Sequence, residues 1–173
     1  MNLFQRLLPL LLLFEMLSIS LKAQSSEVWV FLSEDCPVSL SQSLELRALE
    51  EQFGSQFTFV YAFPISSDVA AVNTFVKKAN LKGKILLEGA WEQAMAWGAT
   101  TMPEVFVFDA DGRKVYQGRI DNSFSQIGQR QRGVIVRDLY DVLTDVMRHV
   151  PVAFRQTAAV GCLIPQKKTT STP

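Results

Sequence analysis

The residues best suited to chemistry are two cysteines, Cys36 and Cys162. Cys36 precedes Pro37, and proline favours the first position of a helix, so Cys36 is expected at a helix N-cap. The unpaired N–H groups and partial positive charge of a helix N-terminus favour a thiolate. The neighbouring acidic residues Glu34 and Asp35 oppose it through like-charge repulsion. Cys36 is therefore the candidate reactive group, and a buried, inert cysteine is the alternative.

Serine occupies the position where a second cysteine would complete a dithiol pair with Cys36. Ser39 can hydrogen-bond a thiolate, but it cannot resolve a mixed disulfide. Cys162 could do so, because Gly161 gives the tail freedom to approach. A resolving thiol, a static disulfide that holds the tail to the domain, and an unpaired tail thiol all stay open for Cys162.

Metal and cofactor chemistry is not indicated. His149, the single histidine, falls at the end of an expected helix, and the segment around Cys36 holds one cysteine, so no metal site and no cofactor are expected. The 173 residues include 17 basic and 17 acidic side chains. This balance gives no electrostatic reason to expect nucleic acid or an anionic membrane as a partner.

The N-terminal segment is typical of an export signal. Arg6 precedes an apolar run over residues 7–14, and cleavage is expected after Ala23. An uncleaved membrane anchor is the alternative, although the run is short for a bilayer, so no stable span is expected after cleavage. The interpretation divides the chain into a signal peptide (1–23), a folded domain (24–150) and a C-terminal tail carrying Cys162 (151–173).

Hydrophobic periodicity predicts the elements that position the cysteines. Strands are expected at residues 28–32, 57–63, 84–87, 104–108 and 114–120. Helices are expected from Pro37 to a closing Gly54, from Val69 to Lys78 after the N-cap Asp68, and over residues 91–97. In the first helix, Leu40, Leu44 and Ala48 recur at helical spacing, flanked by Leu46, Leu49 and Phe53.

The second half of the chain predicts a hairpin and a terminal helix. The turn at residues 109–112 ends in Asp-Gly between two β-rich runs, which is a strong hairpin signal. Residues 121–133 are expected to form a polar loop, and Val134 to begin the apolar positions of the last helix. A strand–helix–strand order implies parallel strands, and the hairpin adds antiparallel ones. The pattern therefore predicts an α/β fold with one mixed central sheet and helices on both faces.

This order, with Cys36-Pro37 at the first helix and Met102-Pro103 before the hairpin, resembles the thioredoxin fold. It is most similar to the redoxin branch, the thioredoxin-like and peroxiredoxin-like proteins that bacteria export. The segments that carry the resemblance are residues 31–37, 101–107, 109–121 and 160–164. The resemblance implies that Pro103 is cis and faces Cys36, and that Pro37, Ser39, Met102 and Pro103 border a substrate groove.

The resemblance implies thiol–disulfide exchange outside the cytoplasm, in the periplasm or as a secreted protein. Cys36 would attack the disulfide of a protein substrate or redox partner, and Cys162 would release the mixed disulfide. A thiol peroxidase is one alternative, since Ser33 matches a hydroxyl position of peroxiredoxins and Arg119 is the candidate arginine, although Trp29 replaces a proline of that family. The other is a non-catalytic binding module with a structural Cys36–Cys162 disulfide, which Ser39 and Asp35 favour.

Overall fold

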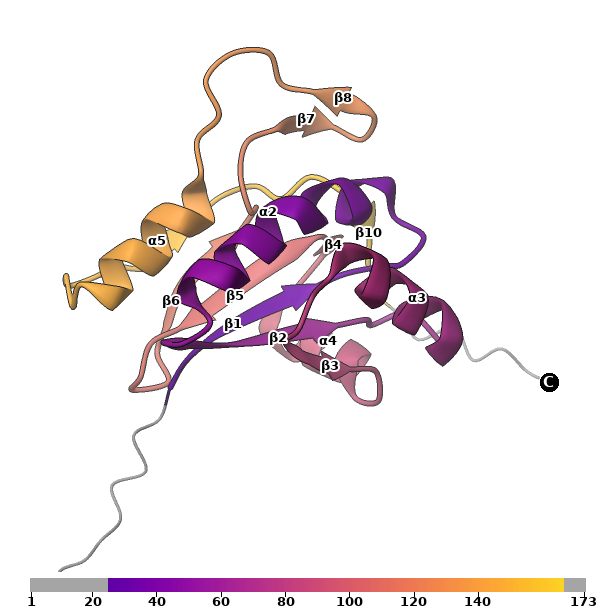
Figure 1. Ribbon diagram of the computed structural model, residues 1–173, viewed down its shortest axis with the longest axis horizontal. Helices are drawn as coiled ribbons and strands as arrows, with labels where there is room; N and C mark the ends of the chain where they lie inside the picture. The colour runs from indigo at the N-terminus through magenta and orange to yellow at the C-terminus, as the bar shows by residue number, and fades with distance from the viewer. Residues whose placement is uncertain (1–24, 167–173) are drawn as a thin grey trace, which may run out of the picture.

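A mixed six-stranded sheet forms the centre of the computed structural model, which describes residues 25–166 (Figure 1). The predicted signal peptide lies outside the described residues. The strand order is β3-β2-β1-β5-β6-β9. These strands are β1 (Ser26–Phe31), β2 (Phe57–Ala62), β3 (Lys84–Leu86), β5 (Glu104–Phe108), β6 (Lys114–Gly118) and β9 (Arg155–Gln156). β1 runs parallel to β2 and antiparallel to β5, so the predicted α/β fold with a mixed sheet is confirmed.

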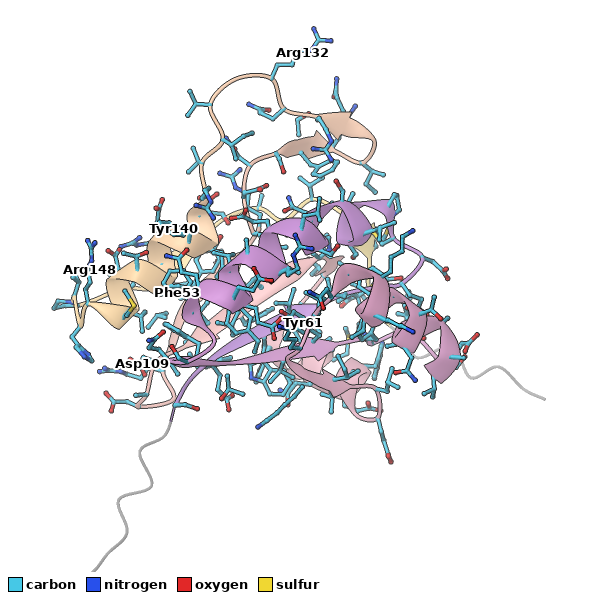
Figure 2. The ribbon with its side chains drawn as sticks, in the orientation of Figure 1. Phe53, Tyr61, Asp109, Arg132, Tyr140 and Arg148 are labelled. Carbon is cyan, nitrogen blue, oxygen red and sulfur yellow. The ribbon has the colours of Figure 1, made fainter. Side chains whose placement is uncertain are left out.

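Helices cover both faces of the sheet, as the sequence predicts. They are α2 (Pro37–Phe53), α3 (Val69–Ala79), α4 (Ala90–Trp97) and α5 (Asp138–Met147). The second half of α2 joins α3 and α5 in one hydrophobic core, and the buried residues of α4 belong to a second core. In the first core, Phe53 at the end of α2 meets Tyr140 of α5 with ring centroids 5.7 Å apart (Figure 2).

The buried face of α2 differs from the predicted one. Leu40 and Leu44 are exposed, Leu44 by 63%. In the first half of the helix the buried positions include polar side chains, among them Gln42, which donates hydrogen bonds to Asp121 Oδ1 (2.7 Å) and Ser123 Oγ (3.0 Å). After Val38, the next buried apolar position of the helix is Leu46, because the buried residues between them, Ser39, Gln42 and Ser43, are polar.

The predicted start of the last helix is wrong, since α5 begins at Asp138 and Val134 is 86% exposed. Residues 134–136 are β-branched, which lowers helix propensity. Their backbone groups also bond elsewhere: Asn122 donates to the Val134 carbonyl (3.3 Å), and the Val136 N–H donates to Asn122 Oδ1 (2.7 Å). Asn122 therefore holds the segment in a non-helical conformation.

The segment predicted as a polar loop contains a hairpin. Its strands are β7 (Phe124–Gln126) and β8 (Gln129–Arg130), which pair antiparallel and extend away from the sheet (Figure 1). Arg132, which follows β8, points outward (Figure 2).

The C-terminal tail joins the folded body through two short strands without a local sequence signal. β9 pairs in parallel with β6, and β10 (Cys162–Leu163) pairs antiparallel with β4 (Thr101–Met102). The second pairing brings the tail to the N-terminal end of α2 (Figure 1). Among residues 25–166, no helix combines the length and apolar character needed to cross a membrane.

Candidate active site

Cys36 lies at the N-cap of α2, as the sequence predicts. Its backbone is extended (φ −84°, ψ 118°), Pro37 takes the first helical position, and the side chain makes no capping hydrogen bond. The residue is 1% exposed, and its thiol donates a hydrogen bond to the Met102 carbonyl oxygen at 3.2 Å. The sulfur is thus free of a capping role and is turned toward the opposite loop.

The Met102–Pro103 bond is cis, which confirms the expectation that the resemblance implied. The carbonyl that Cys36 contacts belongs to this peptide bond, so the cis-proline loop borders the thiol. Met102 is buried, whereas Pro37 is exposed beside Cys36. Of the four residues expected along a groove, Pro37 is the one open to solvent, and Met102 contributes its backbone.

Ser39 lies in the first turn of α2, and it is buried. Its hydroxyl accepts a hydrogen bond from the Ser33 N–H at 3.3 Å. The Ser39 side chain therefore fixes the loop before Cys36, and its backbone N–H faces the cysteine sulfur.

Cys162 lies directly against Cys36. The two sulfur atoms are 2.6 Å apart, with the Cys162 thiol as donor, and both cysteines are free. Disulfide formation brings two sulfurs to about 2.05 Å, so the pair is within reach of bond formation. The contact joins residues that the sequence separates by most of the domain.

The two thiols have opposite shifts in pKa. Burial raises the pKa of Cys36, but the hydrogen bonds from the Cys162 thiol and from backbone N–H groups, including those of Ser39 and Val38, outweigh it and leave the pKa below its ordinary value. Burial, the hydrogen bond to Cys36 and the negative charge of Cys36 raise the pKa of Cys162 to about 11. Cys36 is accordingly the more acidic thiol of the pair, and Cys162 is the less acidic one.

Glu104 holds β4 in place, although no motif in the sequence marks this residue. Its buried carboxylate accepts hydrogen bonds through Oε2 from the N–H groups of Thr100 (2.8 Å) and Thr101 (3.1 Å). Its Oε1 accepts a third bond from Gln117 Nε2 at 3.0 Å. The available signal was an acidic residue that directly follows Pro103 at the start of an otherwise apolar strand.

Gly161 was expected to make the tail flexible, but in the structure it has a different role. A Cβ atom at this position would lie 2.0 Å from the Met102 carbonyl oxygen. Glycine is therefore required so that the tail backbone can approach the cis-proline loop closely.

Two residues considered for other chemistry, Arg119 and His149, lie in the second half of the described chain. Arg119, the candidate arginine of a peroxidase site, donates from Nε to Asp138 at 2.8 Å. His149 follows the end of α5. Within the part of the chain that the structure describes, no three or more His, Cys, Asp or Glu residues form a group that could hold a metal ion.

Solved structures with the same fold define the class of protein. A hypothetical protein from Sinorhizobium meliloti 1021 superposes with a TM-score of 0.72 at 22% identity, over 85% of this chain and 82% of that chain. An uncharacterized conserved protein from Geobacillus kaustophilus gives 0.70 at 22% identity, over 86% and 81%. The thioredoxin domain of a thiol-disulfide oxidoreductase from Bacteroides vulgatus gives 0.55 at 13% identity, over 75% and 81%. This chain therefore has a thioredoxin-like fold, with a thiol at the start of the first helix.

The family match is more specific than the fold. Residues 16–129, more than half of the chain, match the model of the Redoxin family, and the chain belongs to that family. The matched range includes Cys36 and Pro103 and ends before Cys162. No curated protein matches the chain in sequence.

Proposed function

We propose that this protein is an exported thiol–disulfide oxidoreductase in which Cys36 is the nucleophile and Cys162 the resolving thiol. The observation that carries the proposal is the contact of the two sulfurs at 2.6 Å, beside the cis-proline loop. Membership of the Redoxin family supports thiol chemistry at Cys36. The N-terminal pattern at residues 1–23 supports export to the periplasm or the outside of the cell.

The proposed reaction transfers a disulfide from a partner protein to the Cys36–Cys162 pair. The Cys36 thiolate attacks one sulfur of the partner's disulfide, and the second partner sulfur leaves as a thiolate and takes up a proton. The Cys162 thiol then loses its proton, and the resulting thiolate attacks the Cys36 sulfur. The bond between Cys36 and the partner's first sulfur breaks, and that sulfur leaves and is protonated. The partner ends with two thiols, and the pair ends as a disulfide. An external dithiol must reduce the pair before the next turnover.

The pKa values of Cys36 and Cys162 depend on each other, and this dependence sets the order of the two exchange steps. While Cys36 is a thiolate, its charge and its hydrogen bond help to hold the pKa of Cys162 at about 11, so Cys162 stays protonated. A mixed disulfide removes the charge of Cys36, and with it this contribution to the raised pKa. Cys162 therefore becomes more acidic at the stage at which it must act as a nucleophile.

A redox titration tests the proposal against a structural disulfide. The mature protein is equilibrated in glutathione buffers, free thiols are alkylated, and masses are read. A Cys36–Cys162 bond with a potential of about −120 to −270 mV lies in the range of working oxidoreductases. A potential below about −300 mV indicates a structural disulfide and contradicts the proposal, as does the absence of any bond.

Two variants test the separate roles in reduction of a protein disulfide such as that of insulin. Cys36→Ser is expected to abolish the reaction, and Cys162→Ser to accumulate a mixed disulfide between Cys36 and the substrate. Leu44→Ala, at an exposed position on α2, is the matched control and is expected to behave as the parent protein. Unchanged activity of Cys36→Ser would overturn the proposal.

A further inference from the structure

We propose that the segment of residues 122–137 docks this protein onto a membrane surface that carries anionic lipids, without crossing the bilayer. The arginines of the segment bind lipid phosphates, and its exposed aliphatic side chains enter the boundary between the headgroups and the acyl chains. The segment takes no part in the proposed redox reaction, so the inference stands independently of that reaction.

The charge of this segment differs from the charge of the whole chain. The chain is neutral overall, whereas residues 122–137 contain three arginines and no aspartate or glutamate. Arg137 forms an ion pair with Glu45 at 2.8 Å. Among residues 25–166, neither Arg130 nor Arg132 forms an ion pair with a carboxylate. The segment therefore presents two positive charges that are available to an external anion.

Both of these arginines border a hollow in the hairpin of β7 and β8. The hollow has a volume of about 720 Å³ and is lined by Ser125, Gly128, Gln129, Arg130, Gln131 and Arg132. Every side chain of this lining other than glycine can donate a hydrogen bond, and none is acidic. Phosphate oxygens accept strong hydrogen bonds from guanidinium groups. The hollow thus has the chemistry that an anionic lipid headgroup requires.

Exposed aliphatic residues precede and follow the arginines along the chain. Ile127, in the turn between β7 and β8, is 52% exposed. Val134 is 86% exposed, and Ile135 and Val136 are 43% exposed each. Basic side chains next to exposed aliphatic ones are typical of segments that lie at a membrane interface.

The shape of the segment favours a lipid surface over a protein partner. The hairpin and the loop that follows it project away from the sheet, and Arg132 points outward (Figures 1 and 2). A stable protein interface buries about 800 Å² on each partner, which requires a broad complementary face. A narrow projection with aliphatic side chains can instead enter the interfacial layer of a membrane without a matching surface.

Contacts with α2 and within the segment fix its orientation. Gln42 of α2 donates a hydrogen bond to Ser123 Oγ at 3.0 Å, at the base of the hairpin. Arg130 donates a hydrogen bond to the Ser41 hydroxyl, also on α2. Asn122 holds the aliphatic residues after the hairpin in a non-helical conformation. The segment is therefore presented to the membrane by the folded body.

The test is co-sedimentation of the mature protein, residues 24–173, with lipid vesicles. This chain contains every described residue and leaves out the apolar run at residues 7–14, which would itself bind lipid. One set of vesicles contains phosphatidylglycerol mixed with phosphatidylethanolamine, and the other contains phosphatidylcholine alone. Circular dichroism of each variant checks that the fold is retained.

Two variants change the segment, and two matched controls change exposed residues elsewhere. Arg132→Gln is compared with Arg148→Gln, which removes the same charge from the exposed arginine after α5. Val134→Asp is compared with Val69→Asp, at a 56% exposed valine in the first turn of α3.

The parent protein is expected to bind the vesicles that contain phosphatidylglycerol more tightly than those of phosphatidylcholine, and salt should weaken the binding by screening. Arg132→Gln is expected to weaken it about fivefold, which is the contribution of one basic side chain near an anionic surface. Val134→Asp is expected to weaken it at least about tenfold, because an apolar contact is lost and a repelled charge is added. Both controls are expected to bind as the parent protein does.

Failure of the parent protein to bind the anionic vesicles would overturn the proposal. Binding of glycerol phosphate in place of vesicles would assign the hollow to a soluble anion, and binding of polyglutamate in place of vesicles would indicate an acidic protein partner. Either result would contradict docking to a membrane. Equal losses in Arg148→Gln and Arg132→Gln would also overturn it, since the attraction would then come from net charge. None of these outcomes bears on the redox reaction of Cys36.

Discussion

At the scale of single residues, the reactivity of Cys36 is decided by competition between burial and hydrogen bonding. Burial disfavours the thiolate, and the N–H groups of the first helical turn and the Cys162 thiol favour it. The resulting pKa is below that of an ordinary cysteine because the hydrogen bonds outweigh the loss of solvent. The donor that does most to lower this pKa comes from the tail and not from the helix.

Removal of that donor should therefore raise the pKa of Cys36. In Cys162→Ala, burial still disfavours the thiolate while the main opposing hydrogen bond is lost, so the pH midpoint of Cys36 alkylation is expected to move upward. Since the thiolate is the reacting form, the alkylation rate near pH 7 should fall. The rate of iodoacetamide modification, read by mass for the peptide that contains Cys36, measures this. Leu44→Ala is expected to keep the parent midpoint, and an unchanged or lowered midpoint in Cys162→Ala would contradict the argument.

At the scale of elements, β4 has only two residues and depends on a buried carboxylate. Glu104 accepts the N–H groups of Thr100 and Thr101 and the amide of Gln117. Without it, the Thr101 N–H and the Gln117 amide would remain in a buried environment with no acceptor, and the more exposed Thr100 N–H would lose its partner. The position of the cis-proline loop against Cys36 thus depends on a residue that touches neither sulfur.

Glu104→Ala is expected to lower the free energy of unfolding by about 3 kcal/mol, because each buried donor without a partner costs about 1–3 kcal/mol. Glu104→Gln keeps the side-chain shape and one carbonyl acceptor, so its loss should be smaller. The control Glu88→Ala changes an exposed residue and is expected to stay within about 0.5 kcal/mol of the parent. Urea unfolding of the three variants measures these differences. A loss in Glu104→Ala as small as that of the control would refute the assigned role.

At the scale of the whole molecule, the tail pairs first with β6 at one edge of the central sheet and then with β4, next to the start of the first helix. β9 fixes it beside β6, and β10 places Cys162 at Cys36. The effective concentration of Cys162 at Cys36 is therefore set by an attachment made several residues earlier in the chain. Thr157 is central to this attachment, since its hydroxyl also accepts the Arg119 N–H at 3.1 Å.

Thr157→Ala should consequently make the Cys36–Cys162 disulfide easier to reduce. Loss of the hydroxyl removes its hydrogen bonds with the Tyr116 hydroxyl and with the Arg119 N–H, each worth about 0.5–1.5 kcal/mol, so a shift of at least about twofold is expected in the equilibrium with glutathione. The matched control is Thr74→Ala, at an exposed threonine of α3. An equilibrium constant equal to that of the control would mean that β9 does not govern the approach of the tail.

The sequence alone determined the elements whose signals are local. Apolar strand runs, the Asp-Gly turn and the caps at Cys36 and Asp68 predicted the mixed sheet, the hairpin and the place of Cys36 at the start of α2. These features depend on neighbours within a few residues, so they can be read without the fold. The error at Leu44 arose because the buried face of α2 carries Gln42 with its polar partners instead, and the error at Val134 arose because Asn122 bonds the backbone of that segment.

Only the tertiary structure decided that Cys162 meets Cys36 and not solvent. Strands as short as β4 and β10 have no periodicity, and their pairing joins distant parts of the chain. Position 161 must be glycine because the Met102 carbonyl lies against it in the folded chain. Glu104 likewise acquires its role only when folding brings the backbone of β4 to its carboxylate. The sequence thus specified a thiol at a helix N-terminus, whereas packing between distant segments specified its neighbour Cys162 and the direction of its pKa shift.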